Sequence, residues 1–357
     1  MDLTTFWFIL IGVLWVGFLT LEGFDFGVGM LLPVLGREGG LSGDASVTAD
    51  EAEKRRRVLL TTIGPHWDGN EVWLLTAGGA MFAAFPHWYA TMFSAFYLPL
   101  LLLLVALIVR NMGFEYRHKR DDATWRRNWD LSIIGGSIAA PLLVGVALTN
   151  IVRGLPLELP AGAPPGASEF TGTLLTLLNP MSLLGGVVIV ALSLTHGAFF
   201  TALKTDGAIR AEAREVGTKV GVVAALLAVV LLLWLGITQG TLWSWVTTVI
   251  AAVMLLGGIW FNIQGAEGKA FAATMVTIAT AVATYFLLLF PNVMPSTTNP
   301  DWSLTIENAA SSPLTLKIMT GAALVFTPIV LAYTIWTYWV FRRRLTTAQI
   351  PAPVQVR

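Results

Sequence analysis

Four carboxylates lie inside long apolar stretches of this sequence, where an ionised side chain is costly unless it is paired, solvated or protonated. Glu22 and Asp25 are three residues apart in the first apolar stretch, and Asp68 and Glu71 repeat that spacing in the second. Residues at this spacing share one face of a helix. Carboxylates that meet in a low dielectric cannot all ionise, so they share protons. The pattern therefore indicates proton handling inside a membrane.

The two pairs are expected at matching depths. Asp25 and Asp68 each lie about ten residues from the inner end of their helix, which is ~15 Å at the helical rise. Antiparallel neighbouring helices would bring the pairs together. Glu115 follows the inner end of the third apolar stretch and extends the set toward the cytoplasm. The hypothesis is a chain of protonatable sites that starts on the inside and reaches mid-membrane.

A structural interpretation of the same residues stays open. Gly64 and Pro65 interrupt helical hydrogen bonding in the second stretch. Asp68, Asn70 and His66 would then satisfy backbone groups near the break. Alternatively, the carboxylates pair with an arginine of a neighbouring helix.

The other polar and aromatic candidates are assigned structural roles or left open. His66 and His196 lie in apolar stretches, where a histidine can ligate a haem, but a satisfied buried imidazole is expected for both. Arg110 is expected to snorkel from the end of its helix. Trp67 and Trp73 flank the second carboxylate pair and either line a cavity or pack. We predict no metal ligand and no catalytic residue, since the chain has no cysteine and no P-loop, Rossmann or hydrolase motif.

The elements that position these residues follow from composition. The chain is 55% hydrophobic and 12% charged, far from the values of soluble domains, and its formal net charge of zero gives no electrostatic case for nucleic acid. About 20 apolar residues span a membrane. The sequence therefore predicts an all-α, polytopic membrane bundle with about nine transmembrane helices, at residues 5–35, 58–85, 87–112, 129–152, 181–203, 216–238, 242–262, 270–290 and 316–341.

The basic residues predict the orientation. Lys and Arg favour the cytoplasmic side in short loops. With the C-terminus inside and nine helices, every one of the 22 Lys and Arg residues except Arg153 and Lys317 lies inside, so the N-terminus is outside. We predict one transmembrane domain, residues 1–345, with a short cytoplasmic tail at 346–357.

Two sequence motifs resemble those of a known protein family. The sequence resembles subunit II of the cytochrome bd-type quinol oxidases at GFDFGVG, residues 23–29, and at GPHWDGNEVWL, residues 64–74. Shorter matches follow in the family's order: GFEYR at 113–117, WD at 129–130, NP at 179–180, FPNVMPS at 290–296 and SSPLTL at 311–316. Glu22 and Glu115 stand where aspartate is common in relatives, which keeps the carboxylate and changes its reach.

This resemblance implies a heterodimer in a bacterial cytoplasmic membrane. A partner, subunit I, carries haems b and d, and the complex oxidises quinol and reduces O2 to water. This chain would ligate no haem; it would scaffold subunit I and help to conduct protons and O2. Asp25, Asp68 and Glu115 match family positions on the proton route, and Trp73 matches one near the oxygen channel. Some relatives also hold a structural quinone or small accessory subunits.

Two other function classes compete with this interpretation. A proton-coupled secondary transporter also uses midplane carboxylates, but it predicts an internal inverted repeat, and none is visible. A pure assembly scaffold would contain the same carboxylates as structural groups. Neutral substitutions such as Asp68→Asn separate the scaffold from a proton conductor, and co-purification with a haem protein separates the oxidase from the transporter.

Overall fold

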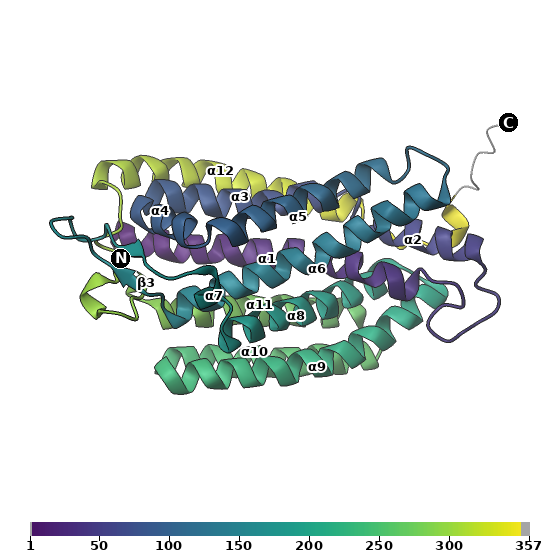
Figure 1. Ribbon diagram of the computed structural model, residues 1–357. Coiled ribbons are helices and arrows are strands. Elements are labelled where there is room, and N and C mark those ends of the chain that lie inside the picture. Colours follow the sequence, from purple (N-terminus) through teal and green to yellow (C-terminus); the bar gives the residue numbers. More distant parts are fainter. Residues whose placement is uncertain (1, 351–357) are drawn as a thin grey trace.

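The computed structural model describes residues 2–350 as a bundle of long, roughly aligned helices (Figure 1). The α-helices are α1 (Leu3–Leu35), α2 (Ala49–Ile63), α3 (Trp67–Ala84), α4 (Pro86–Ala95), α5 (Tyr97–Tyr116), α6 (Ala123–Arg153), α7 (Leu174–Leu177), α8 (Pro180–Lys204), α9 (Gly207–Gln239), α10 (Leu242–Ile263), α11 (Glu267–Leu289) and α12 (Pro313–Val340). Two short 3-10 helices are η1 (Pro300–Trp302) and η2 (Thr347–Gln349).

The strands are confined to the end of the bundle where α1 begins (Figure 1). Strand β1 (Leu157–Glu158) pairs antiparallel with β2 (Glu169–Phe170), and β3 (Asn292–Met294) pairs antiparallel with β4 (Leu304–Thr305). These two-stranded ribbons stabilise loops between helices and do not form a core. The chain is therefore a polytopic helical bundle, as the composition predicts.

Eight helices in residues 2–350 are long and apolar enough to cross a membrane: α1, α5, α6, α8, α9, α10, α11 and α12. Two of the stretches predicted as single helices are broken. The second separates into α2 and α3 at Gly64–His66, where Pro65 lacks an amide hydrogen. The third separates into α4 and α5 at Phe96. Pro99 accounts for this second break, because it removes a hydrogen bond to the carbonyl of Ala95 and its ring clashes with that carbonyl.

Helix α1 lies at the centre and packs against α3, α6, α8 and α11. Its contact with α8 is a backbone contact. An added Cβ on Gly27 would lie 2.2 Å from the Ser193 carbonyl oxygen and 2.7 Å from the Gly197 Cα. Small residues permit such close approach between membrane helices. This contact fixes the height of α1, and with it Glu22 and Asp25, against the rest of the bundle.

Helix α12, in contrast, packs loosely against the rest of the chain. Its only fully buried residue is Leu316 among the described positions, and Leu324, Ile335 and Trp336 are more than half exposed. Beyond α12, Leu345 donates its amide to the carbonyl of Lys204 at 2.8 Å, which ties the chain to the α8–α9 junction. Residues 346–350 of the predicted tail include η2, whereas 351–357 lie outside the described residues.

Candidate functional site

Glu22 and Arg110 form a buried ion pair between α1 and α5. Glu22 Oε1 accepts a hydrogen bond from Arg110 Nη1 at 2.5 Å, and both side chains are 0% exposed. Arg110 Nε donates to Ser137 Oγ of α6 at 3.1 Å. The guanidinium also lies 4.7 Å and 4.8 Å from the ring centroids of Phe26 and Phe114, a stabilising arrangement when water is excluded. A fixed cation therefore neutralises Glu22.

The expectation that Arg110 snorkels from its helix end is wrong. The sequence suggested that this helix ends at residue 112, but α5 continues to Tyr116, so Arg110 lies more than one turn inside it. A buried guanidinium keeps its proton and needs an acidic partner. Pairing with an arginine is the structural alternative raised for the four carboxylates, and it holds for Glu22.

Asp25 is the second fully buried carboxylate, and a chain of hydrogen bonds holds it. Asn70 Nδ2 of α3 donates to Asp25 Oδ2 at 2.7 Å, and the Tyr338 hydroxyl of α12 donates to Asn70 Oδ1 at 2.8 Å. The ring of Tyr338 stacks on His66, with centroids 4.2 Å apart. These contacts join the break between α2 and α3 to the centre of α1.

Asp25 and Glu22 lie three residues apart on α1, and both are 0% exposed. Within residues 2–350, Asp25 Oδ1 and Glu22 Oε2 are buried without a hydrogen-bond donor. A single proton held between the two carboxyl groups would satisfy both oxygens. The pair would then carry one negative charge, which Arg110 balances.

Glu71 is a half-buried carboxylate on α3. Its Oε2 accepts a hydrogen bond from Asn111 Nδ2 at 2.6 Å, and Asn111 directly follows Arg110 on α5. Consecutive residues of α5 thus contact a carboxylate on α1 and one on α3. The structure thus links Glu22 and Glu71 through consecutive residues of α5, while Asp25 is linked to α3 through Asn70.

Asp68 and Glu115 lie apart from this cluster. Both side chains are exposed on the isolated chain, Asp68 in the first turn of α3 and Glu115 in the last turn of α5. Asp68 Oδ1 accepts the amide of Gly69 at 2.7 Å. In the described part of the chain, no hydrogen bond or ion pair joins either carboxylate to Asp25. The helical period explains why Asp68 is remote from Asp25. Asn70 is the α3 residue that faces α1, and Asp68, two residues earlier, points in another direction.

The aromatic candidates pack around the cluster. Trp67 contacts Phe114, with centroids 5.3 Å apart. Trp73 lies on the backbone of α1 at Gly17, where an added Cβ would be 2.1 Å from its ring. His196 has both ring nitrogens engaged, Nδ1 with Thr274 Oγ1 at 2.6 Å and Nε2 with the Thr20 carbonyl at 3.1 Å. His196 is thus the satisfied imidazole that the sequence favours, with no nitrogen free for a haem.

A second charged cluster lies where α2, α5 and α6 meet, at the opposite end of the bundle from the strands. Arg117, 0% exposed, donates from both Nη atoms to Glu53 at 2.8 Å and from Nε to Asp130 at 2.6 Å. Burial alone would raise the pKa of Glu53, but the hydrogen bonds and charge of Arg117, with Arg126 and Arg56 nearby, outweigh it and hold that pKa below its usual value. This cluster locks the three helix ends together.

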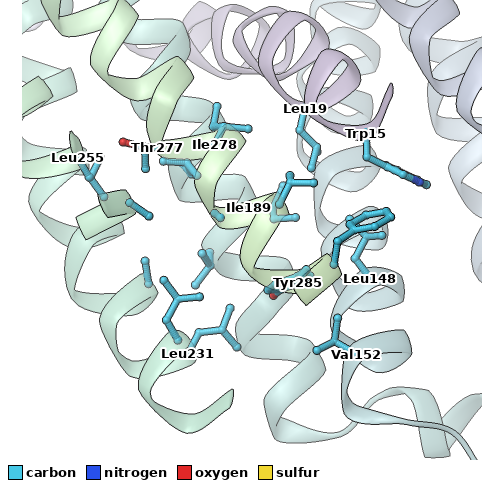
Figure 2. A pocket seen from close by; sticks show the side chains of 18 of the residues that line it. Trp15, Leu19, Leu148, Val152, Ile189, Leu231, Leu255, Thr277, Ile278 and Tyr285 are labelled. Atoms are coloured by element: carbon cyan, nitrogen blue, oxygen red, sulfur yellow. The ribbon is translucent and has the colours of Figure 1, made fainter. Parts of the chain in front are cut away.

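An apolar cavity of about 300 Å³ lies beside α1 (Figure 2). Its wall includes Trp15 and Leu19 of α1, Ile189 of α8 and Tyr285 of α11. Leu19 is one helical turn from Glu22, so the cavity ends close to the carboxylate cluster. The Tyr285 hydroxyl bonds to Thr149 at 2.9 Å, which leaves the wall almost entirely apolar.

Sequence reasoning missed four residues of the cluster: Arg110, Asn111, Ser137 and Tyr338. An arginine in an apolar stretch is itself a signal for a buried acidic partner, and that signal was available for Arg110. Tyr338 is 268 residues from Asn70, and nothing local in the sequence indicates their contact.

Comparison with known proteins agrees with the motifs. The family profile described as "Cytochrome bd terminal oxidase subunit II" matches residues 3–341. The "Cytochrome bd ubiquinol oxidase subunit 2" of Bacillus subtilis is 39% identical over 346 residues, covering 95% of this chain and 96% of the relative. The "Cytochrome bd-I ubiquinol oxidase subunit 2" of Escherichia coli K12 is 36% identical, covering 96% and 95%.

A solved structure shares the fold. A chain of the bd oxidase from Geobacillus thermodenitrificans superposes with a TM-score of 0.58 at 14% identity, covering 94% of this chain and 98% of that one. At this identity the likeness concerns the fold alone.

Proposed function

Because this chain belongs to the cytochrome bd terminal oxidase subunit II family, we propose that it scaffolds a haem-bearing subunit I in the bacterial plasma membrane and conducts protons and O2 toward it. Members of the family are subunits of a quinol-oxidising, oxygen-reducing complex. The haems b and d of the complex belong to the partner in this proposal, and this chain ligates none. Family membership gives the transporter alternative no support.

The orientation follows from treating each broken helix as one crossing. With α2 and α3 together as one span, and α4 and α5 as another, the chain crosses nine times. The basic residues then gather at the end of the bundle where α2 lies, opposite the start of α1 (Figure 1). We place this end in the cytoplasm and the start of α1 outside.

The proton route centres on Asp25, and its burial beside a neutralised Glu22 is the observation that carries the proposal. Because Arg110 compensates one charge, the proton shared between Asp25 and Glu22 can be gained or released without leaving two uncompensated charges. Asp25 Oδ1 takes the proton while Oδ2 stays bonded to Asn70. In this proposal Glu115, Asp68 and Glu71 carry protons from the cytoplasmic end to this pair.

The exposed carboxylates also indicate where subunit I docks. A carboxylate at membrane depth is too costly to face lipid. Helix α12 lies on the same side of the bundle as α5 and as α3, which contains Asp68 (Figure 1). We therefore place subunit I against α3, α5 and α12, where its polar groups would complete the proton route through Asp68 and Glu115.

O2 is apolar and dissolves in apolar space, so the cavity beside α1 supports a role in holding or passing it. Trp73 belongs to α3, a helix of the proposed partner face, and its ring is pressed on Gly17 of α1. The same apolar wall would also suit the ring or tail of a structural quinone. Small accessory subunits would add to the partner face.

The test is Asp25→Asn in the complex with subunit I. Asparagine donates to Glu22 Oε2 and keeps the fold, so assembly, read as normal haem absorption per subunit, is expected to persist. Quinol-driven O2 consumption is expected to fall at least ten-fold. Glu215→Gln is the matched control, since Glu215 is exposed and pairs only with the exposed Lys219 among described residues.

Three outcomes separate the hypotheses. Normal haem content with lost turnover supports proton conduction. Normal turnover in an assembled Asp25→Asn complex contradicts conduction through Asp25 and leaves the scaffold role. A wild-type chain that purifies without a haem protein contradicts the oxidase assignment.

A further inference from the structure

A groove at the proposed cytoplasmic end is separate from the carboxylate cluster and from the proposed partner face. It has a volume of about 940 Å³ and lies between the end of α1, the start of α2 and the start of α6. Its basic lining residues are Lys54, Arg56, Arg57, Arg126 and Arg127. Five cationic side chains from two helices thus face one open space at the membrane boundary.

The acidic residues of the groove do not cancel this charge. Four line it: Glu38, Asp50, Glu53 and Asp130. Glu53 and Asp130 are already bound by the buried Arg117, which is not itself a lining residue. With Arg117 included, six basic side chains stand against these four acidic ones, so the groove keeps a positive excess.

Two of the cations have no acidic partner within residues 2–350. Lys54 is half-buried on α2 and Arg127 is exposed on α6, and the structure records no ion pair for either of them in that range. Arg126, between them, pairs with Asp121 and lies 4.0 Å from Glu53. Unpaired cations that converge on one space are available to an anion.

The membrane side of the groove is apolar. Leu32 and Pro33 of α1 and Leu131 and Ile134 of α6 complete the lining. Leu131 is 57% exposed, and Pro33 is also exposed, so an acyl chain could run along this wall. A free phosphate would use the cations and leave the apolar wall in contact with water.

We propose that this groove binds an anionic phospholipid of the inner leaflet. Its phosphodiester contacts Lys54, Arg126 and Arg127, and an acyl chain lies along Leu131 and Ile134. Basic pockets between transmembrane helices on the cytoplasmic side recognise such head groups. The inference uses the proposed orientation but not the proton route, so it is tested independently of oxidase activity.

The experiment measures lipid retention on the complex with subunit I. The complex is exchanged into mixed phosphatidylglycerol and phosphatidylcholine, and bound lipid is counted by native mass spectrometry. Wild type is expected to retain phosphatidylglycerol preferentially. The variant Lys54→Gln/Arg127→Gln is expected to weaken retention by about five-fold for each side chain removed. Because neither residue has an acidic partner among the described residues, assembly should persist, as haem absorption will verify.

The control removes two charges at the same end. Lys119→Gln/Arg343→Gln changes exposed residues outside the groove, and retention is expected to stay at the wild-type level. Equal loss in both double variants would overturn a localised site in favour of general surface charge. Equal retention of the two lipids by wild type would overturn the proposal outright. Displacement of phosphatidylglycerol by millimolar glycerol phosphate would show a phosphate site that ignores the acyl chain, and would equally reject a lipid.

Discussion

Arg110 and Glu22 meet at 2.5 Å with no solvent contact on either side chain, although α5 and α1 each bring them from the middle of a long apolar segment. The desolvation of such a pair is offset only when the geometry is good and the remaining polar atoms have partners. Here Arg110 Nε donates a hydrogen bond to Ser137 Oγ, and two aromatic rings lie over the guanidinium. The free oxygen of Glu22 is left to interact with Asp25.

Removing Arg110 alone should damage the protein more than removing the whole pair. Arg110→Met leaves Glu22 as an uncompensated buried charge, a change that costs about 3–5 kcal/mol. We expect a lower thermal midpoint and a lower yield of haem-containing complex, and substantial recovery in Glu22→Gln/Arg110→Met. A double variant no better than the single one would show that Arg110 acts through Ser137 and the aromatic rings instead.

Asn70 should control turnover through Asp25. Asn70→Ala removes the donor to Asp25 Oδ2 and leaves that oxygen buried without a partner. A lost hydrogen bond to a charged group is worth about 1.5–3 kcal/mol, so we expect a roughly ten-fold or greater fall in quinol-driven O2 consumption. Tyr338→Phe, which removes only the outer hydrogen bond, should cost less. The prediction fails if the two variants are equally active.

The charged cluster around Arg117 should respond to acid. Arg117 and its neighbours hold the pKa of Glu53 below its usual value despite burial. A carboxylate with a lowered pKa stabilises the fold above its unfolded pKa of about 4.3, and that contribution is lost as pH falls through the folded value. Glu53→Gln should therefore lower the thermal midpoint at pH 7, and the difference from wild type should shrink below about pH 4. A difference independent of pH would contradict this ion pair.

Gly17 should set the position of Trp73. Any side chain at residue 17 must displace the indole, because an added Cβ would be 2.1 Å from its ring. If Trp73 borders the oxygen route, Gly17→Ala raises the apparent KM for O2 several-fold in respirometry on the assembled complex. Gly257→Ala is the control, since nothing lies within 4 Å of an added Cβ there. An unchanged KM with Gly17→Ala would remove Trp73 from the route.

The sequence predicts the bundle and the break at Gly64–Pro65 well, because both follow from local chemistry: apolar length, and a proline without an amide hydrogen. The break at Phe96 is not predicted. Pro99 lies within a continuous apolar stretch, and that stretch gives the pattern of a single unbroken helix. Arg110 was misplaced for a related reason. The helix predicted from the sequence ends at residue 112, whereas the actual helix continues through Phe114 to Tyr116.

The partners of the carboxylates were harder to predict. The equal depths of the two pairs predict that Asp25 lies near α3. Depth does not specify how α3 is rotated about its axis, however, and it is Asn70 rather than Asp68 that faces Asp25. Tyr338 joins from the far end of the chain. Such contacts depend on how whole helices pack, which the Gly27–Gly197 approach sets and no local pattern encodes.

The bare surface of α12 has a consequence for biosynthesis. The described residues offer this helix almost nothing to fold against, since Leu316 is its only fully buried residue among them. If subunit I covers α12 as proposed, a copy made without it exposes an apolar flank and the Asp68 carboxylate to the bilayer. Such surplus copies would be substrates for membrane quality-control proteases, and the fold itself would then set the subunit ratio.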